Sequence, residues 1–413
     1  DWSSDVCSSD LSCNIIYMEV KKMKKLVALL LALAMVACLF AGCASNDKET
    51  TTETPTETTT EPATEPTETS ETTESTDDDA GTVDPSMKVA FVTDVGNIDD
   101  HSFNQYTYEG ITTFAEENSI DCTYYKPAED TDQARIDAIN QAIADGYNTV
   151  VMAGYLFGPA TASCAAEHPE INFLALDVSA GDLGTDTIPS NVSLIVYKEE
   201  QAGYLAGYAA VKAGYTELGF LGGMSVPAVV RYGYGFVQGA DAAAVEDNVD
   251  VNIKYWYSGS FGPTDEIAAK MDSWYTEGTE VVFACGGGIY LSCQSAAEAN
   301  EGKMIGVDVD QSNVSDTIIT SAMKALSNSV RMALTAVGTN GLVWPEAYAG
   351  TCQSLGAKED CVGLPMESSK LGDFDEAAYE TLFQQIVDGT VTIDDTSDPE
   401  QHPTTQKVVV DWQ

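Results

Sequence analysis

Histidine and basic residues are scarce in this chain. Of its 413 residues only three are histidine, and 19 lysines and arginines stand against 65 aspartates and glutamates, which gives a formal net charge of −46. Because so few imidazole side chains are present, a metal site built on histidine is not expected. The strong negative charge repels nucleic acid and anionic lipid surfaces, so we predict no nucleic-acid partner.

The short motifs of common enzyme and cofactor sites are also missing. The chain contains no C-x-x-C pair, no G-x-G-x-x-G or G-K-S/T phosphate loop and no G-x-S-x-G nucleophile elbow. Asp308 and Asp310 alternate along an expected strand and would point to opposite faces, which disfavours a calcium or glycosidase carboxylate pair. We predict no metal, no cofactor and no catalytic residue.

The first 42 residues are predicted to lie outside the folded protein. Residues 1–22 have the character of a non-native leader, and we exclude them from the fold. Residues 23–42 join two lysines to an apolar run that is shorter than the roughly 20 residues of a membrane-spanning helix, as in a lipoprotein signal peptide. Small residues precede Cys43, so we expect this cysteine to be lipidated and to anchor the protein on the extracytoplasmic face of the cell membrane. The alternative is an uncleaved anchor, or an ordinary signal with a chance cysteine.

Residues 43–87 are predicted to form a disordered stalk after the lipidated cysteine. Threonine, glutamate, proline and serine fill this segment, and residues 44–86 contain no aromatic side chain. Such a composition cannot bury a core, and repulsion between like charges keeps the segment extended. The globular part would therefore be held away from the membrane.

Six cysteines remain beyond the predicted anchor, and two of them stand apart. Cys352 and Cys361 flank a glycine-containing loop, whereas the other four lie in apolar surroundings typical of buried thiols. Outside the cytoplasm a local disulfide between Cys352 and Cys361 is plausible, and two free thiols are equally compatible with the spacing.

The rest of the chain alternates apolar β-type runs with amphipathic helical patterns, which predicts a parallel α/β fold. Helices are expected at 102–118, 132–146 and 199–214. Length favours two doubly wound parallel-sheet lobes joined by a hinge over the alternative of one large open sheet. Strands are expected at 89–94, 122–126, 149–153, 172–178, 192–197, 217–221, 251–257, 281–285 and 304–308.

The expected lobe boundaries follow from where the chain is predicted to cross from one lobe to the other and back. We predict that the first lobe comprises residues 88–192 plus about 312–345. The second lobe would comprise residues 193–311 plus about 346–393, and residues 394–413 would form a C-terminal extension.

A loop of polar and aromatic residues follows the first expected strand. The apolar run VAFV leads into Asp94, Phe103 and Asn104 within the segment DVGNIDDHSFN. Ligands in open α/β sheets bind outside the carboxyl ends of such strands, so this loop should face a cleft. Asp99 and Asp100, in the same loop, are expected to be solvated or to cap the next helix.

Several motifs, in one order, resemble a known family. They are D-x-G-x-x-D-D-x-S-F-N near residue 94, GFLGGM at 219–224, GSF at 259–261, and IGVDVDQ at 305–311 followed by TSAMK. This pattern resembles the basic membrane protein family of bacterial solute-binding lipoproteins, over residues 88–393. The resemblance implies a fold of the type I periplasmic-binding-protein kind and capture of purine nucleosides for an ABC importer. His101, Tyr155 and the Gly-Pro-Thr after Phe261 depart from the usual family residues.

The resemblance also implies roles for individual residues. Phe103 and Phe261 would stack above and below the base, and Asp177 would accept a base N–H. Ordinary core packing for each ring, and helix capping for Asp177, are the alternatives that the residues themselves leave open. The complete expected ligand set is Asp94, Phe103, Asn104 and Asp177 for the base, Asp308 and Lys324 for the ribose hydroxyls, Phe261, and the backbone of Gly286 and Gly287 near the sugar.

We therefore expect a lipid-anchored receptor that presents a purine nucleoside to an ABC permease in the membrane. The same transport role for a sugar or another small aromatic solute is an alternative. A structural or adhesive surface lipoprotein is another, although it would leave the convergence of rings and carboxylates unexplained.

Overall fold

The computed structural model describes residues 81–413. The predicted leader, signal peptide, lipidated Cys43 and most of the stalk lie outside these residues. Within the described part of the chain, no helix combines the length and the hydropathy needed to cross a membrane.

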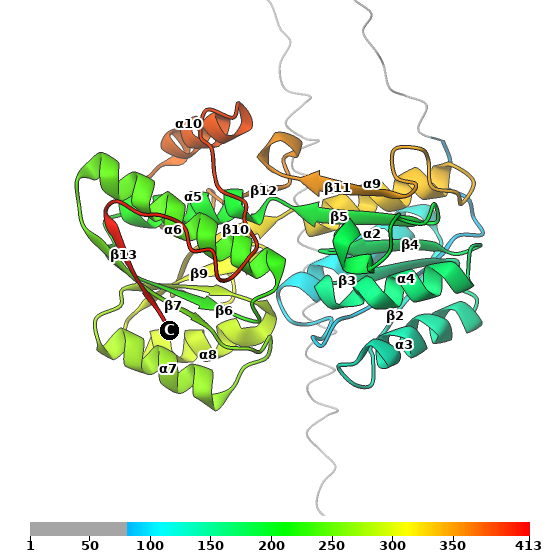
Figure 1. The fold of residues 1–413 in the computed structure, drawn as a ribbon, viewed down its shortest axis with the longest axis horizontal. Helices are drawn as coiled ribbons and strands as arrows, with labels where there is room; N and C mark the ends of the chain where they lie inside the picture. The colour runs from blue at the N-terminus through cyan, green and yellow to red at the C-terminus, as the bar shows by residue number, and fades with distance from the viewer. Residues whose placement is uncertain (1–80) are drawn as a thin grey trace, which may run out of the picture. The chain divides into compact units, whose positions relative to one another are not determined.

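The first lobe is built on a six-stranded sheet in which every neighbouring pair is parallel (Figure 1). Its two central strands β3 and β4 are buried along their whole length, which is why they appear as uninterrupted apolar runs in the sequence. In spatial order the strands are β11 (Thr351–Leu355), β5 (Val192–Tyr197), β4 (Asn172–Leu176), β3 (Thr149–Ala153), β1 (Lys88–Val92) and β2 (Asp121–Tyr125).

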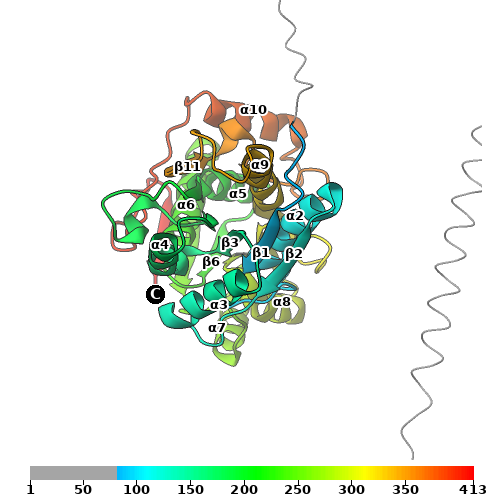
Figure 2. The ribbon, with the colours of Figure 1, turned by 90° about the vertical axis from the view of Figure 1, so that its right-hand side faces the viewer.

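Two pairs of helices cover the faces of this sheet. Helices α2 (Phe103–Asn118) and α9 (Leu326–Thr339) pack together on one face, and α3 (Asp132–Ala144) and α4 (Gly158–Glu167) pack together on the other (Figure 2). Helix α3 starts where the Thr131 hydroxyl accepts a hydrogen bond from the N–H of Ala134 at 3.2 Å, an ordinary N-cap.

The second lobe is built on a seven-stranded sheet. All of its neighbouring strands are parallel except β12, which runs antiparallel to β10 at one edge. In spatial order the strands are β12 (Val362–Gly363), β10 (Ile318–Lys324), β9 (Lys303–Asp308), β8 (Val281–Cys285), β6 (Glu217–Gly222), β7 (Val251–Tyr257) and β13 (Val408–Trp412). Helices α5 (Glu199–Lys212) and α6 (Pro227–Asp247) form one packed pair, α7 (Asp265–Thr276) and α8 (Tyr290–Ala299) form another, and α10 (Glu376–Val387) contacts α5.

The prediction of two doubly wound, mainly parallel lobes is therefore confirmed, and the alternative of one open sheet is wrong. Each predicted strand overlaps an observed one, and the three predicted helices correspond to α2, α3 and α5.

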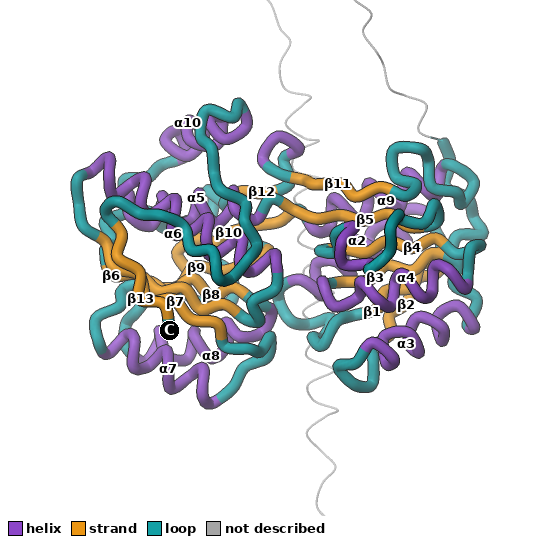
Figure 3. Tube along the Cα trace, in the orientation of Figure 1, coloured by secondary structure: helices purple, strands orange, loops and turns teal. Residues whose placement is uncertain are grey.

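The chain passes between the two sheets three times. These crossings follow Tyr197, Lys324 and Leu355, at the ends of β5, β10 and β11 (Figure 3). Two of them are tied together, because the N–H of Lys198 donates to the carbonyl oxygen of Leu355 at 2.9 Å. The N–H of Ala325, after β10, donates to the carbonyl oxygen of Cys361 at 2.9 Å, so the three crossings form a single hinge region.

The expected return segments were only partly assigned to the right lobes. Helix α9 packs in the first lobe and α10 in the second, as expected, but one strand of each segment belongs to the other lobe. Strand β10 lies within 312–345, which we expected in the first lobe, yet it pairs with β9 in the second sheet. Strand β11 lies within 346–393, which we expected in the second lobe, yet it pairs with β5 in the first sheet. Strand β5, which we expected to begin the second lobe at residue 193, belongs to the first sheet, where it pairs with β4 and β11. The reason is that each strand extends a parallel sheet by one strand before the chain crosses to the other lobe. Strand β10 adds to β9 in the second sheet, and β11 adds to β5 in the first.

The predicted C-terminal extension is an integral part of the second sheet. Strand β13 pairs in register with β7 and forms the sheet edge. One carboxylate oxygen of Asp241, on α6, accepts hydrogen bonds from the consecutive N–H groups of residues 406–408 at 2.7–3.0 Å. Residues 394–413 are therefore fixed against the lobe.

The local disulfide between Cys352 and Cys361 is not formed, and both thiols are free. Cys352 lies in β11 of the first sheet, opposite Leu194 of β5, whereas Cys361 immediately precedes β12 of the second sheet. The loop between the two cysteines is a crossing between lobes and not a hairpin, so the cysteines are carried apart.

Candidate functional site

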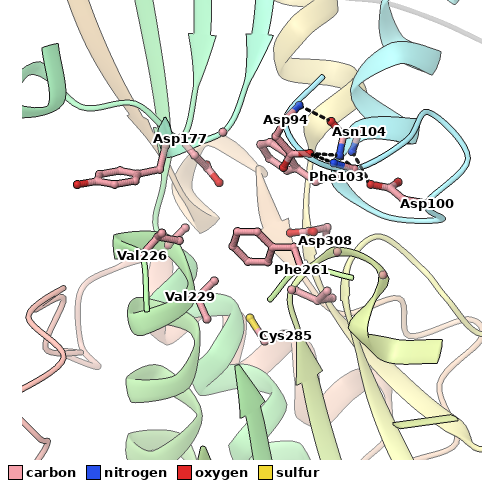
Figure 4. A pocket seen from close by; sticks show the side chains of 18 of the residues that line it. Asp94, Asp100, Phe103, Asn104, Asp177, Val226, Val229, Phe261, Cys285 and Asp308 are labelled. Atoms are coloured by element: carbon pink, nitrogen blue, oxygen red, sulfur yellow. Dashed lines mark hydrogen bonds between the residues drawn. The ribbon is translucent and has the colours of Figure 1, made fainter. Parts of the chain in front are cut away.

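A cavity lies between the two lobes, where the carboxyl ends of strands from both sheets meet (Figure 4). Its empty space is about 760 Å³, including the part open to solvent. This falls within the range of roughly 300–1,000 Å³ that is typical of small-molecule sites. All nine residues of the expected ligand set line it, namely Asp94, Phe103, Asn104, Asp177, Phe261, Gly286, Gly287, Asp308 and Lys324.

The corner contributed by the loop after β1 is held by carboxylate and amide groups. Asp94 Oδ1 accepts hydrogen bonds from Gly96 N at 2.6 Å and from Asn104 Nδ2 at 2.8 Å. Asp100 accepts from the backbone N–H groups of Ser102, Asn104 and Gln105 at 2.9–3.1 Å, so it caps the start of α2 as predicted. Burial is the main cause that raises the pKa of Asp94 to about 6.

The two phenylalanine rings come from different lobes. Phe103 opens α2 in the first lobe, and Phe261 follows β7 in the second (Figure 4). Phe261 packs on glycine backbone: a Cβ atom added to Gly223 would lie 2.5 Å from its ring, and one added to Gly286 would lie 3.0 Å away. Gly286 also has a φ of 151°, which strongly favours glycine. These glycines set the position of the Phe261 ring.

Lys324 is the centre of a buried charge network. Its Nζ atom lies 2.6 Å from Asp177 Oδ2, 3.1 Å from Glu199 Oε1 and 3.9 Å from Asp308 Oδ1. Burial alone would lower the pKa of Lys324, but these three carboxylates raise it above its ordinary value. The lysine is therefore charged, and it joins Asp177 of the first lobe to two acids of the second.

Phe103 also contacts this ammonium group. The Lys324 Nζ atom lies 5.0 Å from the centroid of the Phe103 ring, with the rings of Tyr197 and Tyr232 at 5.2 and 5.5 Å. Such distances allow favourable cation–π interactions.

Asp177 and Asp308 both have unusual backbone conformations. Their φ angles are 58° and 67°, in the left-handed region that non-glycine residues seldom occupy. Backbone strain of this kind concentrates at binding sites. Burial, the largest cause, raises the pKa of Asp177 to about 6, and it also raises the pKa of Asp308. Asp177 Oδ1 is buried without a hydrogen-bond partner, which leaves one acceptor at the cavity wall unsatisfied.

The sequence did not reveal the buried ion pairs of Glu199, which stabilise the charge of Lys324. Glu199 is fully buried at the start of α5, and its Oε2 accepts from Arg231 Nε of α6 at 2.6 Å. Burial would raise the pKa of Glu199, but the charges of Lys324 and Arg231 lower it. The only signal in the sequence was a pair of glutamates opening an otherwise apolar helix.

Other cavity residues were also missed. Val226 and Val229 at the start of α6 form an apolar wall, and Tyr232 lies one turn further along the helix. The thiol of Cys285, at the end of β8, lines the base of the cavity, and burial raises its pKa well above the ordinary value. That thiol is therefore neutral and a poor nucleophile. Among residues 81–413 no cluster of His, Cys, Asp and Glu is arranged to hold a metal ion.

Two mainly parallel α/β lobes, joined by three crossings and enclosing a cavity at the carboxyl ends of their strands, define the fold class of the periplasmic solute-binding proteins. Solved structures agree. An ABC transporter system solute-binding protein from Aeropyrum pernix K1 has a TM-score of 0.67 and 21% identity, over 76% of this chain and 95% of that chain. A similar protein from Conexibacter woesei DSM 14684 has a TM-score of 0.60 and 22% identity, over 75% and 99% of the two chains.

Residues 87–397 match the family model Bmp, described as ABC transporter substrate-binding protein PnrA-like, and the chain belongs to this family. It is 31% identical to the ABC transporter nucleoside-binding protein BmpA of Lactococcus lactis subsp. cremoris over 297 residues, which are 68% of this chain and 72% of that protein. It is 29% identical to basic membrane protein A1 of Borrelia garinii subsp. bavariensis over 314 residues, 73% of this chain and 87% of that protein.

The predicted family is thereby confirmed. The protein is an extracytoplasmic, membrane-associated substrate-binding component of an ABC transporter and not an enzyme. Its partners are a small-molecule ligand and a membrane permease.

Proposed function

We propose that this protein captures a purine nucleoside between its lobes and delivers it to an ABC permease. The observation that carries the proposal is the pair of aromatic rings, Phe103 and Phe261, supplied to one cavity by opposite lobes and accompanied by buried carboxylates. A flat base offers two faces to stack and an edge of N–H donors, which is the chemistry that rings and carboxylates recognise.

In this proposal the base lies between the two rings. Stacking on an aromatic side chain contributes about 1–3 kcal/mol per base, so two rings supply a large share of the binding free energy. The unpaired Asp177 Oδ1 accepts a base N–H, which removes the cost of an unsatisfied buried acceptor. Asp94 and Asn104, already hydrogen-bonded to each other, form the remaining polar edge.

The ribose in turn lies against the second lobe. Asp308 and Lys324 present an acceptor and a donor for its hydroxyl groups, and the backbone of Gly286 and Gly287 lies beside them. The name of the Lactococcus lactis relative, a nucleoside-binding protein, supports this choice of ligand.

We propose further that Cys43 carries a lipid and that residues 43–80 act as a stalk. An apolar run followed by small residues and a cysteine supports the first statement, and the Thr/Glu/Pro composition supports the second. Residues 81–87, expected to end the stalk, instead pack on α9 of the first lobe, where Val83 and Met87 are buried.

Isothermal titration calorimetry on residues 81–413 tests the ligand. Guanosine, inosine and adenosine are titrated beside the free bases, ribose and galactose. Nucleosides should bind more tightly than their separate bases or sugars. Binding of a sugar alone would assign the same transport role to a different solute. Absence of binding by the whole panel would contradict the nucleoside proposal.

A further inference from the structure

The turn that precedes Phe103 makes two hydrogen bonds to the opposite lobe. Ser102 Oγ donates to Asp308 Oδ2 at 2.7 Å, and Gln311 Nε2 donates to the carbonyl oxygen of His101 at 2.9 Å. The side chains of Ser102 and Gln311 are fully buried. Both contacts join residues more than 200 positions apart in the sequence and connect the two lobes.

The turn itself is stiff. The Asp100 carboxylate accepts the N–H groups of Ser102 and Asn104, and His101 adopts a φ of 50°. Phe103 is the next residue after Ser102 and the first of α2. An interaction that holds Ser102 in place therefore also holds the start of α2 and the Phe103 ring in place.

Gln311 is held just as firmly from its own lobe. Its Oε1 accepts from Val307 N at 3.0 Å, and its backbone N–H donates to Ser321 Oγ at 3.1 Å. The orientation of the amide is therefore set by the second sheet, and its NH₂ group points at the His101 carbonyl.

We propose that Ser102 and Gln311 are positioning residues, which hold the turn of the first lobe against the second lobe and thereby fix the Phe103 ring. Neither residue lines the cavity. Their effect on binding acts through Phe103 and through the equilibrium between open and closed lobes, which a ligand shifts only by its preference for the closed form. The proposal does not depend on the identity of the ligand.

The expected change in the open population follows from the interactions that replace these two hydrogen bonds when the lobes part. When the lobes part, water takes over both hydrogen bonds, so each contributes only the modest net free energy of a protein hydrogen bond, increased at Ser102 by the charge of Asp308. The ion pair between Lys324 and Asp177 also crosses the lobes and remains. Loss of one contact should therefore raise the open population by about three- to tenfold and not abolish closure.

Cys285 provides a built-in reporter of opening. It lies at the base of the cavity with 1% of its surface exposed, while Cys164 and Cys293 are fully buried in the packed interiors of the first and second lobes. Alkylation of Cys285 should become faster when the lobes part, because parting exposes the base of the cavity, whereas alkylation of the other two requires a lobe to unfold.

The experiment measures iodoacetamide labelling of each cysteine, by peptide mass spectrometry, in the ligand-free protein. Ser102→Ala and Gln311→Glu, the latter replacing the NH₂ donor by an oxygen, should each accelerate labelling of Cys285 by about three- to tenfold and leave Cys164 and Cys293 unchanged. Thr320→Val is the matched control, because the buried Thr320 hydroxyl is hydrogen-bonded to Ser369 within the second lobe. It should leave labelling of Cys285 at the parental rate.

Two results would overturn the proposal. One is parental labelling of Cys285 in both variants. The other is equal acceleration at all three cysteines, which would show that the residues support overall stability and not closure. If Ser102→Ala does not fold, Gln311→Glu decides between these results alone.

Discussion

The Nζ atom of Lys324 lies 2.6 Å from Oδ2 of Asp177, although the two residues belong to different lobes. A buried ammonium group that lost its only partner would be strongly destabilising. Here Glu199, in the same lobe as Lys324, lies 3.1 Å away and stays with it when the lobes separate. Lys324 can therefore exchange its contact with Asp177 without becoming an isolated buried charge, which makes that ion pair a reversible link across the hinge.

The aromatic rings provide the first prediction. Phe261→Ala and Phe103→Ala should each weaken nucleoside binding by about 1–3 kcal/mol, because each removes one stacking surface. Phe103 is 8% exposed and packs in the core, so Phe103→Ala should also lower the folding stability. Phe261 is more exposed, so Phe261→Ala should lower the folding stability only slightly. Calorimetry and thermal unfolding measure the two effects separately.

Phe114→Ala is the control for these variants. Phe114 is 2% exposed in the same helix as Phe103 and does not line the cavity. It should lose about 3–5 kcal/mol of stability while the folded fraction binds as before. Parental affinity in Phe261→Ala would show that this ring is not a stacking surface.

Asp177 and Asp308 are expected to recognise different parts of the ligand. Each hydrogen bond to a carboxylate contributes about 1.5–3 kcal/mol. Asp308→Asn should weaken the nucleoside but not the free base, and so narrow the gap between them; Asp177→Asn should weaken both. Asparagine tolerates the left-handed backbone at both positions. Equal losses for nucleoside and base from both substitutions would contradict this division.

Affinity and stability should respond to pH in opposite directions. Burial raises the pKa of Asp177 to about 6; Lys324 opposes the shift, and Glu199 and Asp308 add to it. An ionised carboxylate accepts a base N–H more strongly than a protonated carboxyl group does, so affinity should fall as pH drops through 6, by up to about tenfold per pH unit. A raised carboxyl pKa contributes stability at low pH that is lost as pH rises through the folded value. Asp177 should therefore stabilise the ligand-free protein more at pH 5 than at pH 7.

The matched variant for the pH prediction is Asp177→Asn, which cannot titrate at this position. Its affinity should vary less with pH than that of the parent, and its gain in stability toward pH 5 should shrink. Asp94, whose pKa burial also raises to about 6, accounts for part of any slope that remains. Unchanged slopes in the variant would assign the pH response to Asp94 or to another group.

Glu199 should be more important for stability than any surface acid. Glu199→Gln removes a buried charge shared by Lys324 and Arg231, and breaking such a pair costs about 3–5 kcal/mol. Glu246→Gln is the control, since Glu246 pairs with Lys212 on the surface and should cost less than about 1 kcal/mol. Denaturation by urea compares them. Similar midpoints for the two variants would show that the buried network adds little.

Lipidation is tested on the full chain in a bacterial host. Cys43→Ser should accumulate without a fatty-acid label, because serine has no thiol to form the thioether. Metabolic labelling followed by membrane fractionation measures this, with Cys38→Ser, in the apolar run of the predicted signal, as the control that should still be labelled. A labelled Cys43→Ser protein would place the anchor elsewhere.

Strands and the cavity residues were predictable, but the lobe boundaries and the charge network were not. Buried parallel strands leave apolar runs in the sequence. The family motifs near Asp94, Phe261 and Asp308 predicted which residues line the cavity. Strands β10 and β11 are each similar to the others locally, and only their partners β9 and β5 decide to which sheet they belong. Likewise, Glu199 and Arg231 look like surface residues until the packing of α5 on α6 buries Glu199 and covers most of Arg231.

The interleaving of the two lobes also constrains the order in which the protein can fold. Strand β11 pairs with β5 although more than 150 residues separate them, and helix α9, which covers one face of the first sheet, follows the whole sheet of the second lobe apart from β12 and β13. A chain emerging from its N-terminus therefore carries β1 to β5 with an open edge and an uncovered face while the second lobe is still being delivered. Such long-range pairing slows folding and exposes apolar surface in the meantime. The nascent first lobe thus keeps one sheet edge and one sheet face uncovered until α9 and β11 arrive.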